Sequence, residues 1–213
     1  MRIDGRAVGL AAALFWTTCA MPSVAAGGPD FRSERASADV RGLAHWVIEI
    51  GEHRRRPFAI VDKLDARIYV FDAAGGLIGA SAALIGSARG DRSAPGVGTK
   101  PLASLQPHER TTPAGRFASE PGQNDKGEAI VWIDYEAALA LHRLRPAPAR
   151  ERRPLRLASP SPEDNRISLG CIVVPGAFYD AVVQPSLGSG RGTVYVLPED
   201  VPAQHLFAAA RWD

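Results

Sequence analysis

Cysteine is nearly absent from this sequence, with two among 213 residues. Charge of either sign is also not in excess, because the net charge is +2, so there is no global electrostatic case for nucleic acid as a partner. Nothing in the chain has metal-ligand spacing, and there is no internal repeat and no heptad pattern. The sequence therefore implies neither a metal nor an organic cofactor, and we expect a monomer.

Residues 1–25 have the pattern of a secretory signal peptide. Basic residues are followed by an apolar run from Ala7 to Trp16 and by the small residues Ser23-Val24-Ala25. The apolar run is shorter than the ~20 residues that span a bilayer. We expect cleavage before Ala26, a periplasmic or cell-envelope location, and contact with the membrane through this segment only. An uncleaved anchor is the alternative.

Cleavage would also change the cysteine count. Cys19 would leave with the signal peptide, so that Cys171 would remain as the one cysteine of the mature chain. A cysteine without an intramolecular partner in an exported protein indicates a reactive or intermolecular thiol. The alternative is an inert, buried cysteine that packs as a small apolar residue.

The length is typical of one domain with a short extension, and it is enough to bury a core without disulfides. We expect an N-terminal extension over residues 26–57, a catalytic domain over 58–200 and a tail over 201–213. Within the extension, apolar residues recur at helical spacing after Ser37, a plausible cap, and predict a short helix: Val40, Leu43, Ala44 and Val47.

From residue 58 the pattern changes to short β-branched and aromatic runs between glycine and proline turns. This pattern predicts a mostly β fold, a largely antiparallel sandwich or barrel, with one or two short helices. One helix is expected from Gly176 to Val183, and Ala137–Leu141 is a buried strand or helix. The expected strands are Phe58–Val61, Arg67–Phe71, Leu77–Ile85, a short piece at Phe117, Ile130–Ile133 and Gly192–Leu197.

Two stretches are predicted to be long loops. Residues 86–108 are rich in Gly, Ser, Pro and Arg, and residues 143–163 contain six arginines among prolines. Loops of this length in a compact domain are usually functional or disordered. The arginine-rich loop is either a solvated basic surface or a lid that meets carboxylates, which arginine binds in a bidentate manner.

The segment from Asn165 to Ile172 carries the strongest chemical signal. Gly170 allows a tight turn before Cys171, so the main-chain N–H groups of Leu169, Gly170 and Cys171 could form an oxyanion hole. A helix begins a few residues later, and its positive end could lower the thiol pKa.

A thiol nucleophile also needs a base. His142 follows a buried apolar stretch and is the candidate, whereas His108 lies in a charged loop. The alternative for His142 is a hydrogen-bonded core histidine.

These residues resemble the L,D-transpeptidase (YkuD-type) catalytic domain family. Thr112-Pro113-Ala114-Gly115-Arg116-Phe117, with Val61-Asp62-Lys63 and Tyr69-Val70-Phe71, is similar to the opening half of that domain. Ser168-Leu169-Gly170-Cys171-Ile172 resembles its catalytic signature, and His142 matches its upstream histidine. The resemblance covers roughly residues 58–198.

The resemblance implies a β-sandwich-like fold and a Cys-His mechanism on the stem peptides of peptidoglycan. The cysteine would attack the L,D bond between diaminopimelate and the terminal D-Ala of a tetrapeptide stem, forming a thioester. An amine would resolve it to a cross-link, and water would give a carboxypeptidase. The resemblance implies no cofactor.

The chain departs from the family at four points. Arg143 follows the histidine in place of Gly or Ser, Leu169 replaces the usual His, and Val173 replaces Arg or Asn. The spacer from His142 to Cys171 is long, at 171 − 142 = 29 positions. We expect Ser168, Arg166 and Arg143 to contact the substrate. A hydrolase on the same fold, or a non-catalytic wall-binding relative, is the alternative function.

Overall fold

The structure, a computed structural model, describes residues 29–207. The expected signal peptide and Cys19 lie outside these residues. No helix within the described part of the chain is long and apolar enough to cross a membrane.

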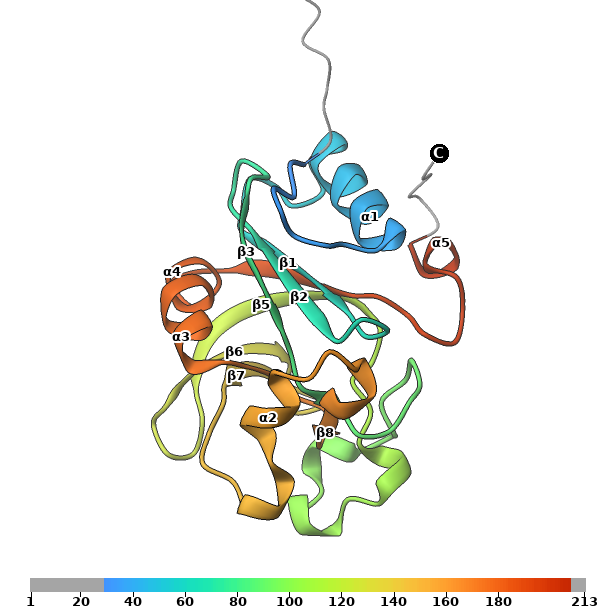
Figure 1. The fold of residues 1–213 in the computed structure, drawn as a ribbon, viewed down its shortest axis with the longest axis vertical. Helices are drawn as coiled ribbons and strands as arrows, with labels where there is room; N and C mark the ends of the chain where they lie inside the picture. Colours follow the sequence, from blue (N-terminus) through green and yellow to red (C-terminus); the bar gives the residue numbers. More distant parts are fainter. Residues whose placement is uncertain (1–28, 208–213) are drawn as a thin grey trace, which may run out of the picture.

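Most of the regular structure is β. One mixed sheet has eight strands in the order β3-β2-β1-β10-β5-β6-β7-β9, and β4 and β8 form a separate pair (Figure 1). Neighbouring strands are mainly antiparallel, but β1 with β10, β7 with β9, and β4 with β8 are parallel. The strands are β1 (Phe58–Asp62), β2 (Arg67–Phe71), β3 (Leu77–Ala82), β4 (Ile85–Gly86), β5 (Gly115–Gln123), β6 (Ala129–Asp134), β7 (Leu139–Arg143), β8 (Arg166–Ser168), β9 (Ile172–Val174) and β10 (Gly192–Val196).

The long strand β5 joins two halves of this sheet. It pairs with β10 through residues 115–119 and with β6 through residues 120–123. A central core takes apolar side chains from β1, β2 and β10 in one half and from β6, β7 and β9 in the other. The two halves therefore face each other across one core, which confirms the mostly β, sandwich-like prediction.

A second core covers the other face of the first half. Helix α1 (Ala38–Glu49) packs there through Val40, Leu43, Ala44 and Val47, and Ser37 caps it by accepting a hydrogen bond from the Val40 N–H. The predicted helix, its cap and its buried face are confirmed. The short helix α5 (Ala203–Leu206) covers the same core through Ala203 and Phe207, so part of the expected tail is packed.

The predicted helix after Gly176 is a continuous helical run with a π turn in its middle. It consists of α3 (Gly176–Phe178), a π segment (Tyr179–Val183) and α4 (Gln184–Ser186). Its buried residues Tyr179, Val183 and Leu187 complete the central core. The ambiguous stretch before His142 is a strand, because Leu139 and Leu141 reach the core at a spacing of two.

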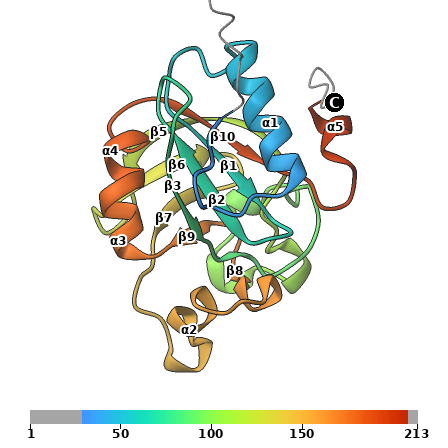
Figure 2. The same cartoon turned by 45° about the horizontal axis from the view of Figure 1, so that its top comes forward.

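The two expected loops carry short helical turns. Residues 87–114 contain three 3₁₀ turns, and the arginine-rich loop contains α2 (Arg153–Leu157) and two 3₁₀ turns. Both loops lie at the end of the molecule that is remote from α1 (Figures 1 and 2).

Candidate active site around Cys171

The turn before Cys171 is held by hydrogen bonds from both sides. The Ser168 hydroxyl donates to the Cys171 carbonyl at 2.6 Å, and the Thr112 hydroxyl donates to the Gly170 carbonyl at 2.6 Å. Gly170 has φ +135°, and a Cβ there would lie 3.0 Å from the Thr111 carbonyl oxygen. Only glycine fits this backbone without strain, so the sequence prediction of a glycine-dependent turn is confirmed.

The turn offers two of the three expected oxyanion donors. The Gly170 N–H already donates to the Ser168 hydroxyl at 3.1 Å, so it is engaged in the turn itself. The N–H groups of Leu169 and Cys171 have no acceptor within residues 29–207. The buried Ser168 side chain thus engages the Gly170 N–H, and the role of that N–H as a third donor stays a prediction. Ser168 is 3% exposed and supports the turn, and its expected contact with a substrate also stays a prediction.

A small cavity of about 20 Å³ lies beside these donors, with room for about one water molecule. Leu169, Gly170 and Cys171 form one wall of it. The β6–β7 turn forms another wall, through Ala137, Ala138 and Leu139. The long loop closes it, through Ser93, Val97 and Glu109. We call residues 92–109 the covering loop.

The covering loop is fixed at several points. Gly98 packs so closely on the β6–β7 turn that a Cβ would lie 2.2 Å from the Glu136 carbonyl oxygen. Within the loop, Lys100 forms an ion pair with the buried Glu109. The covering loop therefore narrows the cavity beside Cys171, which itself is part-exposed.

The thiol of Cys171 hydrogen-bonds the backbone of β7. It donates to the Ala138 carbonyl at 3.6 Å and accepts from the Ala140 N–H. Burial raises the pKa of the Cys171 thiol, and the Ala140 N–H opposes this only in part. The expected lowering by a helix N-terminus is wrong, because β9 separates Cys171 from α3 by roughly 10 Å of extended chain.

His142 lies on β7, the strand next to the one that follows Cys171. Its Nδ1 is 2.8 Å from the Arg143 carbonyl oxygen, which can only accept, so Nδ1 carries the proton and Nε2 has a free lone pair. Burial lowers the pKa of His142 to about 4, with smaller contributions from the Arg145 and Arg153 charges. The imidazole is neutral at pH 7 and is chemically suited to accept a proton.

The two candidate catalytic residues are on adjacent strands. Leu141 pairs with Ile172, and His142 pairs with Val173. Leu141 and Ile172 both face the central core, so the alternation of side chains places His142 and Cys171 on the opposite face. Within the described residues no hydrogen bond joins them, since the thiol bonds the β7 backbone. Their roles as base and nucleophile stay predictions.

Arg166 and Arg143, which we expected to contact the substrate, have other partners. Arg166 is an ion-pair partner of Glu199, whose side chain is 1% exposed, and it also donates to the Lys63 carbonyl. Arg143 pairs with Asp180 at 2.9 Å and lies over the Tyr179 ring. Arg143 follows His142 directly, so it extends to the other face of β7. Both arginines form ion pairs in this structure, and their expected contact with a substrate stays a prediction.

Arg166 belongs to a buried ion-pair network that the sequence did not indicate. The Lys63 ammonium, 1% exposed, donates to Asp91 at 2.7 Å and to the carbonyls of Gly90 and Thr112. Burial works to raise the pKa of Asp91, but hydrogen bonds from Lys63 and from the N–H groups of Glu199 and Asp200 outweigh it and hold the pKa below its usual value. This network anchors the two ends of the long loop, at residues 90–91 and at residue 112.

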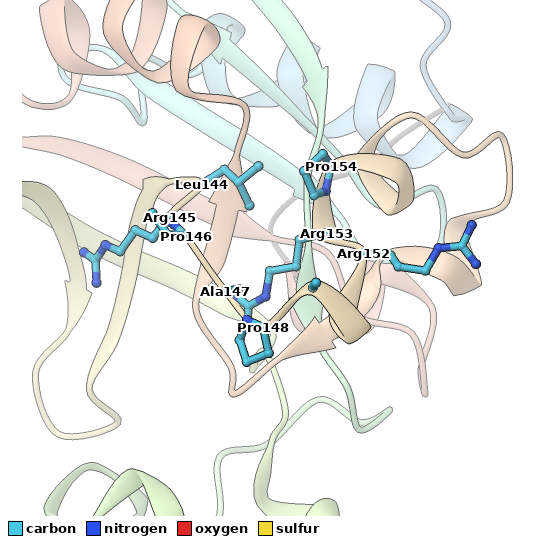
Figure 3. Close-up of a pocket in the computed structure, with 9 residues that line it drawn as sticks. Leu144, Arg145, Pro146, Ala147, Pro148, Arg152, Arg153 and Pro154 are labelled. Carbon is cyan, nitrogen blue, oxygen red and sulfur yellow. The ribbon is translucent and has the colours of Figure 1, made fainter.

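The arginine-rich loop forms an open pocket of about 420 Å³ (Figure 3). Leu144 and Arg145, which follow β7, line one side, and Arg153 lines the other. Arg153 extends toward Ala147, whereas Arg152 points away (Figure 3). Arg156 donates to the carbonyls of Glu151 and Asp164.

Val173 is a core residue in this structure. It is 1% exposed, its N–H donates to the Leu84 carbonyl at 2.9 Å, and the Leu84 N–H donates to its carbonyl at 2.7 Å. Thr112 is a site residue that our sequence reasoning left without a role, although it lies in the Thr-Pro-Ala-Gly motif. Its hydroxyl also accepts from the Gly86 N–H, so it connects β4 to the Cys171 turn.

No family model matches the chain, and no curated protein matches it. Among solved structures, the L,D-transpeptidase LdtMt1 in complex with imipenem is 15% identical with a TM-score of 0.38, and the match covers 66% of this chain and 58% of that one. The catalytic domain of the E. faecium L,D-transpeptidase is 18% identical with a TM-score of 0.36, over 67% of this chain and 98% of that one.

A third similar structure is the helical cell shape determining protein Pgp2 from Campylobacter jejuni, as a K307A mutant. It is 15% identical with a TM-score of 0.42, over 80% of this chain and 62% of that one. This chain thus spans less than two thirds of the length of the first and third proteins. Likeness of this size does not establish family membership, and the functional argument below rests on the residues of this chain.

Proposed function

We propose that the protein is an exported cysteine acyltransferase that acts as an L,D-transpeptidase on peptidoglycan stem peptides. The observation that carries the proposal is that three features lie on one face of β7 and of the segment beside it. Cys171, the unprotonated Nε2 of His142, and the free N–H groups of Leu169 and Cys171 lie on neighbouring segments. A nucleophile, a base and oxyanion donors are the parts that acyl transfer needs.

The proposed reaction begins when the Cys171 side chain turns from the Ala138 carbonyl toward His142 and the covering loop opens. His142 takes the thiol proton, and the sulfur attacks the carbonyl carbon of the third stem residue. The Leu169 and Cys171 N–H groups stabilise the oxyanion. The C–N bond to D-Ala breaks, D-Ala leaves with the proton from His142, and a thioester remains on Cys171.

In the second half of the reaction an amine attacks the thioester carbonyl. His142 takes the amine proton and returns it to the departing sulfur, which restores the thiol and leaves a new amide bond. Water in place of the amine gives the free acid, so a hydrolase differs only in its acceptor. Product analysis with and without an added acceptor amine distinguishes the two.

Intact mass spectrometry tests the proposal. The mature protein is mixed with a tetrapeptide stem or with a carbapenem, which the family resemblance implies as an acylating agent. We expect a stem adduct that has lost D-Ala, or a whole carbapenem adduct, and we expect neither on Cys171→Ala. A wild-type protein that stays unmodified by both reagents contradicts the enzyme proposal.

One observation favours a second candidate, a non-catalytic wall-binding relative. The thiol is bonded to the β7 backbone, and Val173, 1% exposed, occupies a position that is polar in the family. This candidate predicts binding of stem peptides without an adduct.

The proposed location rests on the pattern of residues 1–25. N-terminal sequencing of protein from the envelope fraction should give a start near Ala26. An intact Met1 on cytosolic protein would contradict it.

A further inference from the structure

A second groove lies on the other side of the β6–β7 turn from the Cys171 cavity. It has a volume of about 400 Å³, within the usual range for small-ligand pockets. Strands β5 and β6 supply most of its wall, through Ser119, Glu120 and Trp132. Tyr135 of the β6–β7 turn completes it, and Arg56 and Arg191 lie at its rim. None of these residues takes part in the proposed acyl transfer.

The groove has an aromatic floor. The Trp132 and Tyr135 rings are packed together with centroids 4.7 Å apart and a 30° angle between their planes. Gly122 on β5 makes room for the indole, because a Cβ there would lie 2.4 Å from Trp132 Cδ1. Tyr135 remains 59% exposed, although a large aromatic side chain is more stable when buried. The Trp132 indole thus packs against the sheet, and the exposed Tyr135 ring packs on the indole.

Polar groups surround this floor. The Tyr135 hydroxyl hydrogen-bonds to Glu120, and Arg191 lies 3.6 Å from the same carboxylate. The Ser119 hydroxyl is buried at 1% exposure, so the accessible polar groups of the groove are those of Tyr135, Glu120 and Arg191.

The geometry points to a saccharide subsite in this groove, one that takes a pyranose ring of a glycan. A pyranose presents a flat array of C–H groups, which packs on an aromatic face, and a rim of hydroxyl and amide groups that need hydrogen bonds. Tyr135 on Trp132 offers the face. Glu120 and Arg191 offer an acceptor and donors. Opposite charges already pair within the rim, which suits a neutral sugar better than an ion.

The distance from the groove to Cys171 matches the length of a stem peptide attached to the sugar. This point rests on the proposed function. Trp132 pairs with Ala140, whose N–H bonds the Cys171 thiol. Two strand spacings separate Trp132 from Cys171, roughly 10 Å. In a tetrapeptide stem three residues lie between the sugar and the bond to D-Ala, and three extended residues span about 10 Å.

Binding of tri-N-acetylchitotriose, a peptide-free probe, tests the subsite without catalysis. Tyr135→Ala should weaken binding about tenfold, since exposed aromatic anchors commonly contribute this much, and Trp132 fluorescence or calorimetry gives the Kd. Leu155→Ala, an equally exposed residue on α2, is the matched control and should bind as the wild type does. Arg191→Gln should weaken binding, and Arg150→Gln should not.

The outcomes separate this inference from the proposed function. Two outcomes overturn the saccharide subsite, whatever the acylation results are. Either the wild type does not bind the probe at millimolar concentration, or Tyr135→Ala binds the probe as tightly as the wild type does. Binding of peptides or proteins there without sugar binding overturns it too. Absence of any Cys171 adduct overturns the enzyme proposal and leaves the binding measurement valid.

A kinetic comparison adds a second readout. Acylation by a stem linked to its disaccharide should be faster at low concentration than acylation by the free stem. Tyr135→Ala should remove that difference, whereas Leu155→Ala should retain it. A difference that persists in Tyr135→Ala contradicts the subsite.

Discussion

Burial determines the resting charge of both candidate catalytic residues. It raises the pKa of the Cys171 thiol and lowers that of His142 to about 4, so at pH 7 the pair is a thiol and a neutral imidazole. In this state we expect Cys171 to alkylate more slowly than a model thiol. If the proposed function holds, proton transfer from Cys171 to His142 would accompany substrate binding.

The pKa of His142 gives a pH-dependent stability. The unfolded chain takes up a proton below pH 6.5, whereas the folded protein does so only near pH 4. The unfolded state therefore binds more protons in this window, and the free energy of unfolding falls as the pH drops from about 7 to 4. The contribution of His142 is about 3 kcal/mol.

We expect His142→Asn to lose this contribution. Between pH 7 and pH 4, its unfolding free energy should therefore fall by about 3 kcal/mol less than that of the wild type. Urea denaturation at several pH values measures it. His205→Asn, at an exposed histidine, is the control and should follow the wild type. Parallel curves for all three proteins would show that His142 does not titrate as a buried group.

Val173 is the second prediction at this scale. Because the side chain is 1% exposed and lies between Leu84 and β7, Val173→Asn should bury an unpaired amide and cost about 1–3 kcal/mol. Thermal melting measures this, and Val201→Asn, at a position that is 44% exposed, should change little. A stable Val173→Asn that acylates faster than wild type would instead show that position 173 acts in the site.

Among the elements, the covering loop controls access to the thiol. Gly98 fits against the Glu136 carbonyl only because it lacks a Cβ. Gly98→Ala should push the loop off the β6–β7 turn, so iodoacetamide should modify Cys171 several-fold faster at constant pH. Gly190→Ala, where a Cβ meets open space, should leave the rate unchanged. An unchanged rate in Gly98→Ala would show that the loop does not limit access.

The ion-pair network is the second feature at this scale. Arg166→Met would leave the Glu199 carboxylate buried beside one cation fewer, and the loss of one partner of a buried pair costs about 3–5 kcal/mol. The unfolding free energy measures this, with Arg150→Met at an exposed position as control. A substrate-binding arginine would behave differently, because its loss would raise KM and leave stability nearly unchanged.

For the whole molecule, the net charge of +2 hides a local excess of arginine near His142. We expect the pocket of the arginine-rich loop to attract the carboxylates of the stem. Arg145 and Arg153 line this pocket and are our candidates for this role. Both affect His142 electrostatically, although Arg145 also pairs with Glu128 and Arg153 with Glu151.

Replacing Arg145 and Arg153 together by Gln should raise the apparent substrate constant several-fold and lower turnover less. The difference from wild type should shrink with added salt, since screening acts within about 10 Å at 0.1 M. A variant with Arg150 and Arg152 changed to Gln has the same net charge and is the control. Equal effects of the two double variants would mean that the loop acts only through the overall charge.

Properties that depend on near neighbours in the chain were determined by the sequence itself. The α1 helix, its Ser37 cap and most strands follow from the spacing of apolar residues, because a helix or a strand buries one face at a fixed period. The glycine-dependent turn at Gly170 was readable for the same reason, since it depends on a local φ.

The tertiary structure alone decided which polar groups meet. Whether Arg166 faces a substrate or Glu199, whether the Gly170 N–H is free, and whether the thiol is covered all depend on residues tens of positions away, such as Thr112 and the covering loop. Strand register and loop docking set these distances. They arise from burial of the whole core, and no local pattern encodes them.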